Sequence, residues 1–235
     1  MNIIVSLYHA LLYRPLLNVL VLLSALLPGR DFGVAIILLT LGIRSLLFPL
    51  SARAARAQKK IIELQPKVEE LQQRFKDNRE VLTKKLFEFY RKEGLHPLAP
   101  LLPLLLQLPL LLALYQVLWK GMAGDQLSQL YSFVPRPEDT SVLFLGLVNL
   151  REAFPFLAFL GGTLQFLQSK GITRSQQHSQ GSGGKGMLGA QKIMTFTTPL
   201  VLFFIFAQLP SALSLYWIST TAFSLWEQRW INKHP

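Results

Sequence analysis

One apolar stretch, residues 32–50, constrains the fold of this chain more than any other. It has about nineteen residues, enough at ~1.5 Å per residue to cross most of a ~30 Å hydrocarbon core. A single full charge, Arg44, lies well inside it. An arginine at that depth costs roughly 2.5–3.5 kcal/mol on insertion scales, and a carboxylate on a neighbouring helix is the usual compensation. With the last run counted over residues 211–226, the other apolar runs contain no carboxylate, so we expect Arg44 to meet water, lipid headgroups, backbone carbonyls or a molecule from outside.

The composition places the chain among membrane proteins. Of its 235 residues, 51% are hydrophobic and 16% are charged, whereas a soluble domain usually has about 25% charged residues. The net charge of +11 is compatible with nucleic-acid binding. The basic residues gather between the apolar runs, however, which favours the excess of Lys and Arg on cytoplasmic loops. We therefore expect no sequence-specific nucleic-acid partner.

The residue types needed for most catalytic and metal sites are missing or scattered. The chain has no cysteine, and its four histidines, His9, His96, His178 and His234, lie far apart in the sequence. No His and acidic residues have metal-ligand spacing, and no Ser, His and Asp residues converge. We therefore expect no enzyme activity, no metal site and no cofactor.

Five apolar runs are predicted to cross the membrane as helices, which makes the fold an all-α membrane protein. They are residues 33–50, 98–119, 153–169, 193–208 and 211–230. Residues 3–27 are also apolar, but polar residues and Pro15 interrupt them, and proline disrupts helical hydrogen bonding. We favour an amphipathic helix in the membrane interface there, with a sixth span as the alternative.

The charges between the apolar runs predict the orientation. Segments 52–96 and 170–192 carry an excess of Lys and Arg and are expected in the cytoplasm, whereas loop 120–152 is not basic and is expected outside. The N-terminus is then outside and the C-terminus in the cytoplasm. The expected organisation is an interfacial helix and turn over 1–31, a first span over 32–51, a cytoplasmic helical hairpin over 52–96, spans two to five within 97–231, and a short cytoplasmic tail over 232–235.

Segment 52–96 is predicted to form an antiparallel helical hairpin. Apolar residues recur every three or four positions from Ile61 to Phe75, and a second set runs from Leu82 to Phe89. Pro66 should kink the first arm. The hairpin is either a solvated spacer or a docking arm for partners. The basic residues expected to serve in docking are Lys59, Lys60, Lys67, Arg74, Lys84 and Lys85.

With the last span counted over residues 211–226, the predicted spans lack the intramembrane Asp, Glu or His that a proton-coupled transporter usually needs, and they show no inverted repeat. They carry Arg44 together with amides and hydroxyls. Runs 153–169 and 193–208 are short, and short spans thin the bilayer around them. A hydrated, positively charged groove beside a thinned bilayer would lower the cost of drawing an acidic segment partway across. This describes an insertase that needs no nucleotide, and a small-solute transporter is a weaker alternative.

Several motifs, in this order, resemble those of the YidC/Oxa membrane protein insertases. They include Leu39-Thr-Leu-Gly-Ile-Arg44-Ser-Leu-Leu-Phe-Pro-Leu50, Pro103-Leu-Leu-Leu-Gln107-Leu-Pro109 and Leu209-Pro-Ser-Ala-Leu-Ser-Leu-Tyr216-Trp217. The resemblance covers roughly residues 8–231. It implies a five-span core, a cytoplasmic coiled hairpin and a groove in which Arg44 attracts acidic residues of a substrate.

The resemblance also assigns further residues to the groove. The family's threonine one turn before the arginine falls on Thr40, and its aromatic pair in the last span falls on Tyr216 and Trp217. Its substrate-contacting Gln-x-Pro segment falls on residues 107–109. With the polar Gln165 of the third run, the expected groove residues are Arg44, Thr40, Gln107, Leu108, Pro109, Gln165, Tyr216 and Trp217.

The resemblance implies a multi-pass protein of the bacterial inner membrane whose partners are nascent membrane proteins and lipids. The ribosome and the Sec translocon are candidate further partners. The sequence shows no long basic extension at its C-terminal end, so strong ribosome binding is not expected. We expect insertion through a groove open to cytoplasm and lipid, without nucleotide hydrolysis. The alternative is a non-catalytic membrane chaperone that assists folding and assembly of membrane proteins.

Overall fold

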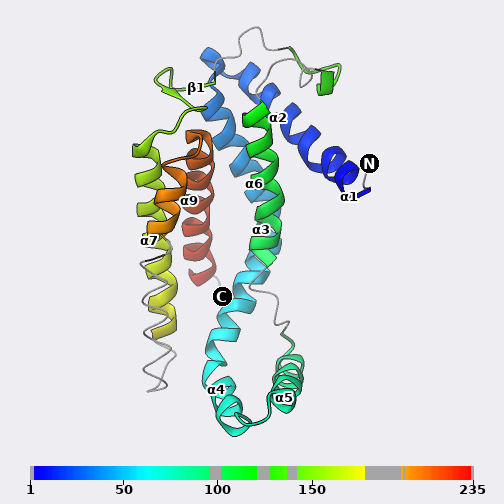
Figure 1. The fold of residues 1–235 in the computed structure, drawn as a ribbon, viewed down its shortest axis with the longest axis vertical. Coiled ribbons are helices and arrows are strands. Elements are labelled where there is room, and N and C mark those ends of the chain that lie inside the picture. Colours follow the sequence, from blue (N-terminus) through cyan, green and yellow to red (C-terminus); the bar gives the residue numbers. More distant parts are fainter. Residues whose placement is uncertain are drawn as a thin grey trace.

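The computed structural model describes residues 3–95, 102–120, 128–136, 142–177, 197 and 199–233, and these are mostly helical (Figure 1). The elements are α1 (Ile3–Tyr8), η1 (His9–Tyr13), α2 (Arg14–Leu26), η2 (Pro28–Arg30), α3 (Phe32–Glu63), α4 (Gln65–Arg74), α5 (Arg79–Lys92), α6 (Leu102–Lys120), β1 (Leu143–Phe144), β2 (Val148–Asn149), α7 (Pro155–Gln177) and α9 (Ser211–Lys233). Residues 199–206 are also helical. Most of the expected loop 170–192 and the start of the fourth run lie outside the described residues.

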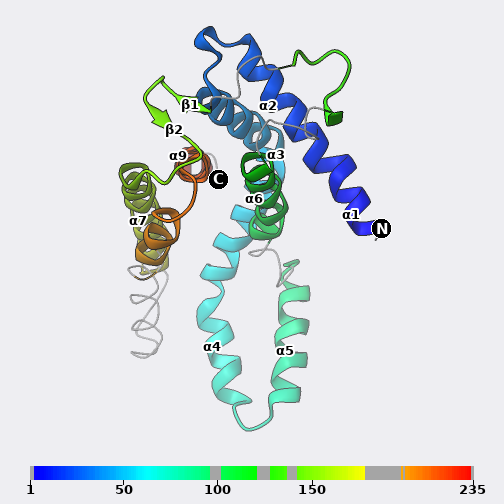
Figure 2. The same cartoon turned by 45° about the horizontal axis from the view of Figure 1, so that its top comes forward.

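The longest helix, α3, joins the helical bundle to the α4/α5 pair (Figures 1 and 2). It starts after Asp31, whose Oδ1 accepts a hydrogen bond from the Val34 amide at 2.9 Å and so satisfies one free N–H of the first turn. It then continues through Pro49 to Glu63. The backbone therefore has no break at the boundary expected between the first span and the hairpin, because the change from apolar to basic residues does not end a helix.

Helices α4 and α5 lie side by side and project away from the bundle (Figure 2). The break between α3 and α4 lies at Leu64, directly before Pro66 in the first turn of α4. Proline is tolerated there because first-turn N–H groups have no helical partner. Val68 is buried between the arms, and Asn78 caps α5 by accepting a hydrogen bond from the Val81 amide at 3.1 Å.

The N-terminal helices α1, η1 and α2 follow one another without a loop and run obliquely to α3 and α6 in both views (Figures 1 and 2). The π-helical turn η1 directly precedes Pro15, whose missing N–H disturbs the hydrogen bonding before it. By length and composition, Val5–Leu26 and Phe32–Ile61 are the two described stretches that could span a membrane. The interfacial position of residues 3–27 and the count of five spans remain predictions.

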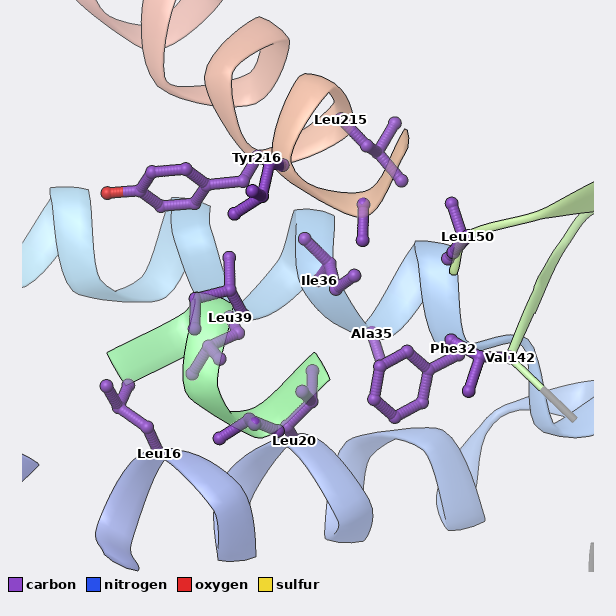
Figure 3. Close-up of a cluster of buried hydrophobic side chains, with 14 of the residues drawn as sticks. Leu16, Leu20, Phe32, Ala35, Ile36, Leu39, Val142, Leu150, Leu215 and Tyr216 are labelled. Atoms are coloured by element: carbon purple, nitrogen blue, oxygen red, sulfur yellow. The ribbon is translucent and has the colours of Figure 1, made fainter. Parts of the chain in front are cut away.

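The hydrophobic core lies where α2, α3, α6 and α9 meet near the β-hairpin. Figure 3 shows Leu16 and Leu20 of α2 facing Ile36 and Leu39 of α3. Tyr216 of α9 lies at one edge of this cluster, and its hydroxyl points away from it (Figure 3). α3 and α9 both begin at this end of the molecule, since the amides of Ser211 and Ala212 donate to carbonyls of residues 152 and 150.

The β-hairpin is a departure from the all-α prediction. β1 and β2 pair antiparallel, with Leu143 opposite Asn149, and the turn contains Leu145 and Gly146 at positive φ. Such short strands carry too little alternation to be recognised in the sequence. The hairpin packs tightly on the start of α3, because a Cβ at Gly33 would overlap Phe144.

Helix α7 continues to Gln177, beyond the expected end of the third run at residue 169. It packs along α9, and the two helices lie side by side in Figure 1. A window of apolar residues marks the part of a helix that suits lipid, but it does not define where the helix ends. The expected loop 170–192 therefore begins as a helix.

Candidate functional site

Arg44 lines a cavity of about 310 Å³ between α3, α6, α7 and α9, and most of the lining residues are polar or charged. We call it the Arg44 cavity. Its lining residues are Arg44, Ser51, Ala55, Gln58, Gln107, Gln165, Gln168, Trp217, Thr220, Thr221, Ser224, Glu227 and Gln228. A polar space of this size has room for several water molecules, each of which occupies about 30 Å³ in the liquid.

The Arg44 guanidinium uses little of its hydrogen-bonding capacity. Its Nη2 donates to Ser224 Oγ at 3.1 Å, while its buried Nε has no partner in the described part of the chain. A guanidinium carries five N–H donors. A buried donor without a partner is unfavourable, so the side chain is suited to an acceptor that enters the cavity, such as water or a carboxylate.

Glu227 is a second charged residue of this cavity, and it is not among the groove residues expected from the sequence. It directly follows the apolar residues 211–226, but α9 continues to Lys233 and Glu227 is only 5% exposed. Ser51 Oγ donates a hydrogen bond to Glu227 Oε1. The expectation that Arg44 has no neighbouring carboxylate is therefore corrected. The position of Glu227, one helical turn after Ser224, is the signal that could have found it.

Two further hydrogen bonds join α9 to α6 and to α7 at the cavity. Gln107 Nε2 of α6 donates to the Tyr216 hydroxyl of α9. Trp217 Nε1 of α9 donates to Gln165 Oε1 of α7 at 3.2 Å. Gln107, Gln165 and Trp217 line the cavity, and Tyr216 is buried behind Gln107. The structure thus brings these four predicted residues together with Arg44.

The other three predicted groove residues do not line the cavity. Thr40 is buried, and its hydroxyl donates to the Ile36 carbonyl of its own helix at 2.7 Å, a common arrangement for a helical threonine. Leu108 is exposed and Pro109 is half-buried. Because successive residues of a helix point in different directions, Gln107 faces the cavity while its two neighbours do not.

The six basic residues singled out in the α4/α5 region are all exposed. Lys60 Nζ donates to the Glu93 carbonyl at 2.7 Å across the base of the two arms. Lys84 and Lys85 pair with Glu80 and Glu88, both at 2.8 Å. Exposed pairs of this kind contribute little to stability, so these side chains are available to a partner at low cost.

Comparison with known proteins gives the family. A family model described as 60Kd inner membrane protein matches residues 23–235. A membrane protein insertase YidC from Francisella philomiragia is 33% identical over 204 residues, which is 87% of this chain and 33% of that protein. A second, from Francisella tularensis subsp. novicida, is 31% identical with the same coverage. This chain spans about a third of the length of these relatives. The chain belongs to the YidC/Oxa family of inner membrane proteins.

Proposed function

We propose that this chain inserts nascent proteins into the bacterial inner membrane, with the Arg44 cavity holding the polar part of the arriving segment. One observation carries the proposal: a guanidinium with unused donors faces a polar cavity between apolar helices. The names of the two Francisella relatives, both membrane protein insertases, support it.

In the proposed arrangement five helices span the membrane, the N-terminus lies outside and the α4/α5 pair lies in the cytoplasm. The β-hairpin end then faces outward, where the core around Ile36 is fully packed. The Arg44 cavity lies further along α3 toward α4. A segment could therefore enter from the cytoplasm and would be blocked toward the outside.

The cavity lowers the cost of moving an acidic segment partway across the bilayer. A carboxylate that leaves water loses its hydration. Arg44 replaces part of that loss with a charge-assisted hydrogen bond, and the amides of Gln107 and Gln165 add polar neighbours. The apolar part of the cargo gains free energy by entering lipid, so no nucleotide is required.

The α4/α5 pair would serve as a docking arm. Its exposed basic side chains suit an acidic surface, and the ribosome and the Sec translocon are candidate partners. In the alternative function, a chaperone for membrane-protein assembly, this arm would hold the partner. Removing the arm would then abolish activity, whereas insertion through the cavity would be partly retained.

The proposal is tested with purified protein in proteoliposomes and a single-span cargo whose translocated tail bears aspartates. Arg44→Ala should reduce insertion roughly 10- to 100-fold, since a hydrogen bond to a charged group contributes about 1.5–3 kcal/mol and about 1.4 kcal/mol is a factor of ten. Arg44→Lys should lose less because the charge remains. Arg53→Ala removes an exposed charge from the same helix and is the matched control. Equal insertion by the Arg44→Ala variant and the unmutated protein would refute the electrostatic role.

A further inference from the structure

The Arg44 cavity contains charges of both signs at two levels along α3 and α9. Arg44 bonds to Ser224, and Ser51 bonds to Glu227. Ser51 lies about two turns after Arg44 on α3, and Glu227 lies about one turn after Ser224 on α9, at 3.6 residues per turn. The carboxylate is therefore closer to the α4/α5 end than the guanidinium is.

The burial of Glu227 needs a physical reason. A carboxylate that is 5% exposed loses most of its hydration, and the loss is large unless other groups compensate for it. Ser51 supplies one neutral hydroxyl. The remaining charged residue of the cavity lining is Arg44, whose Nε lacks a partner among the described residues. Within the described part of the chain, each charge thus has one neutral hydroxyl as its hydrogen-bond partner, and the other charge lines the same cavity.

We propose that Glu227 is the resident counter-charge of Arg44, against which an acidic cargo must compete. This inference rests on the proposed insertase function and adds a residue that sets its selectivity. With Glu227 ionised, the charges lining the described cavity sum to zero, so a single carboxylate or lipid phosphate is held weakly. A cargo with several acids in its translocated tail gains more from Arg44 and is favoured over a cargo with one.

Substitution of Glu227 by glutamine tests the effect of the negative charge alone. The amide is nearly isosteric, and its oxygen still accepts a hydrogen bond from Ser51. Glu227→Gln should therefore strengthen the attraction between Arg44 and a cargo carboxylate. A charge acting across a polar cavity is partly screened, so we expect a change of about two- to fivefold.

The experiment compares two cargoes that differ only in having aspartates or asparagines in the translocated tail. Four proteins are reconstituted: unmutated, Glu227→Gln, Arg44→Gln and the double variant. Glu227→Gln should raise the aspartate-to-asparagine ratio of insertion rates about two- to fivefold, and this gain should vanish in the Arg44→Gln background. Glu63→Gln, which removes an exposed acid from the end of α3, should leave the ratio unchanged.

The inference is overturned if Glu227→Gln affects both cargoes equally, or if its effect persists without Arg44, because either result indicates a structural role. Binding of a synthetic aspartate-tail peptide to the same proteins in nanodiscs is measured in parallel. Glu227→Gln should bind this peptide about two- to fivefold more tightly than the unmutated protein, and equal affinity would refute the inference. Absence of insertion by the unmutated protein would refute the proposed function alone, since the peptide measurement does not depend on it.

Discussion

The two ends of the α3/α9 pair have opposite chemistry although the same two helices form both. Near the β-hairpin, Ile36 is fully buried in a closely packed apolar cluster with Leu215 (Figure 3). About two turns further along α3, the two helices line a cavity with Arg44 and Glu227 among its mostly polar lining residues. The same two helices therefore carry apolar side chains where they meet α2 and the β-hairpin, and polar or charged side chains where they meet α6 and α7.

Tyr216 marks the border between the two ends. Its ring belongs to the apolar cluster, and its hydroxyl accepts a hydrogen bond from Gln107, which lines the cavity. An amphipathic side chain of this kind can satisfy both environments at once. Substitutions in the apolar cluster, at its contact with the β-hairpin and at Tyr216 should therefore have successively smaller effects on stability.

Placing a polar group in the packed end should be the most damaging change. Ile36→Asn removes a fully buried aliphatic side chain and leaves an amide without partners, so we expect a loss of roughly 3–5 kcal/mol of stability. Thermal unfolding in detergent would measure it. Gln165→Asn, at the cavity, should change the midpoint little. Similar losses for both variants would mean that the two ends do not differ as described.

Overpacking the contact between the β-hairpin and the start of α3 should have an intermediate effect. Gly33→Ala places a Cβ against Phe144, and such overpacking costs roughly 1–3 kcal/mol. Gly42→Ala is the matched control, because a Cβ there meets no atom within 4 Å, and it should be neutral or slightly stabilising. The Phe144→Ala change should cost less in the Gly33→Ala background than alone. If the stability losses of Gly33→Ala and Phe144→Ala were additive, the strain in the Gly33→Ala variant would not come from contact with Phe144.

Removing the hydroxyl at the border should have the smallest effect. Tyr216→Phe keeps the ring in the apolar cluster and deletes the bond to Gln107, at a cost of about 1 kcal/mol. Unfolding should be nearly unchanged, while water access to a probe attached at the cavity should rise as Gln107 becomes free to move. A large loss of stability would show that the hydroxyl, and not the ring, holds this junction together.

The sequence predicts the parts of this structure that depend on local pattern. The spacing of apolar residues within 52–96 predicts helices in the regions of α4 and α5. The single charge within residues 32–50 predicts that Arg44 is a site residue, and Arg44 lines the cavity. Glu227 is missed because the acid-free apolar residues end at residue 226, whereas the helix and its buried face continue beyond it. Thr40 and Leu108 were expected in the groove, but the direction in which a helical side chain points depends on packing that one sequence does not reveal.

The unbroken course of α3 has a mechanical consequence. From Arg44 to Glu63 the chain is one helix, roughly 30 Å long at ~1.5 Å per residue, and its first break comes at Leu64. Pro49 lies within this stretch and removes one helical hydrogen bond, so it is the natural point for bending. A partner bound to the α4/α5 pair would therefore be able to tilt α3 about Pro49 and change the angle between the arm and the part of the helix that carries Arg44.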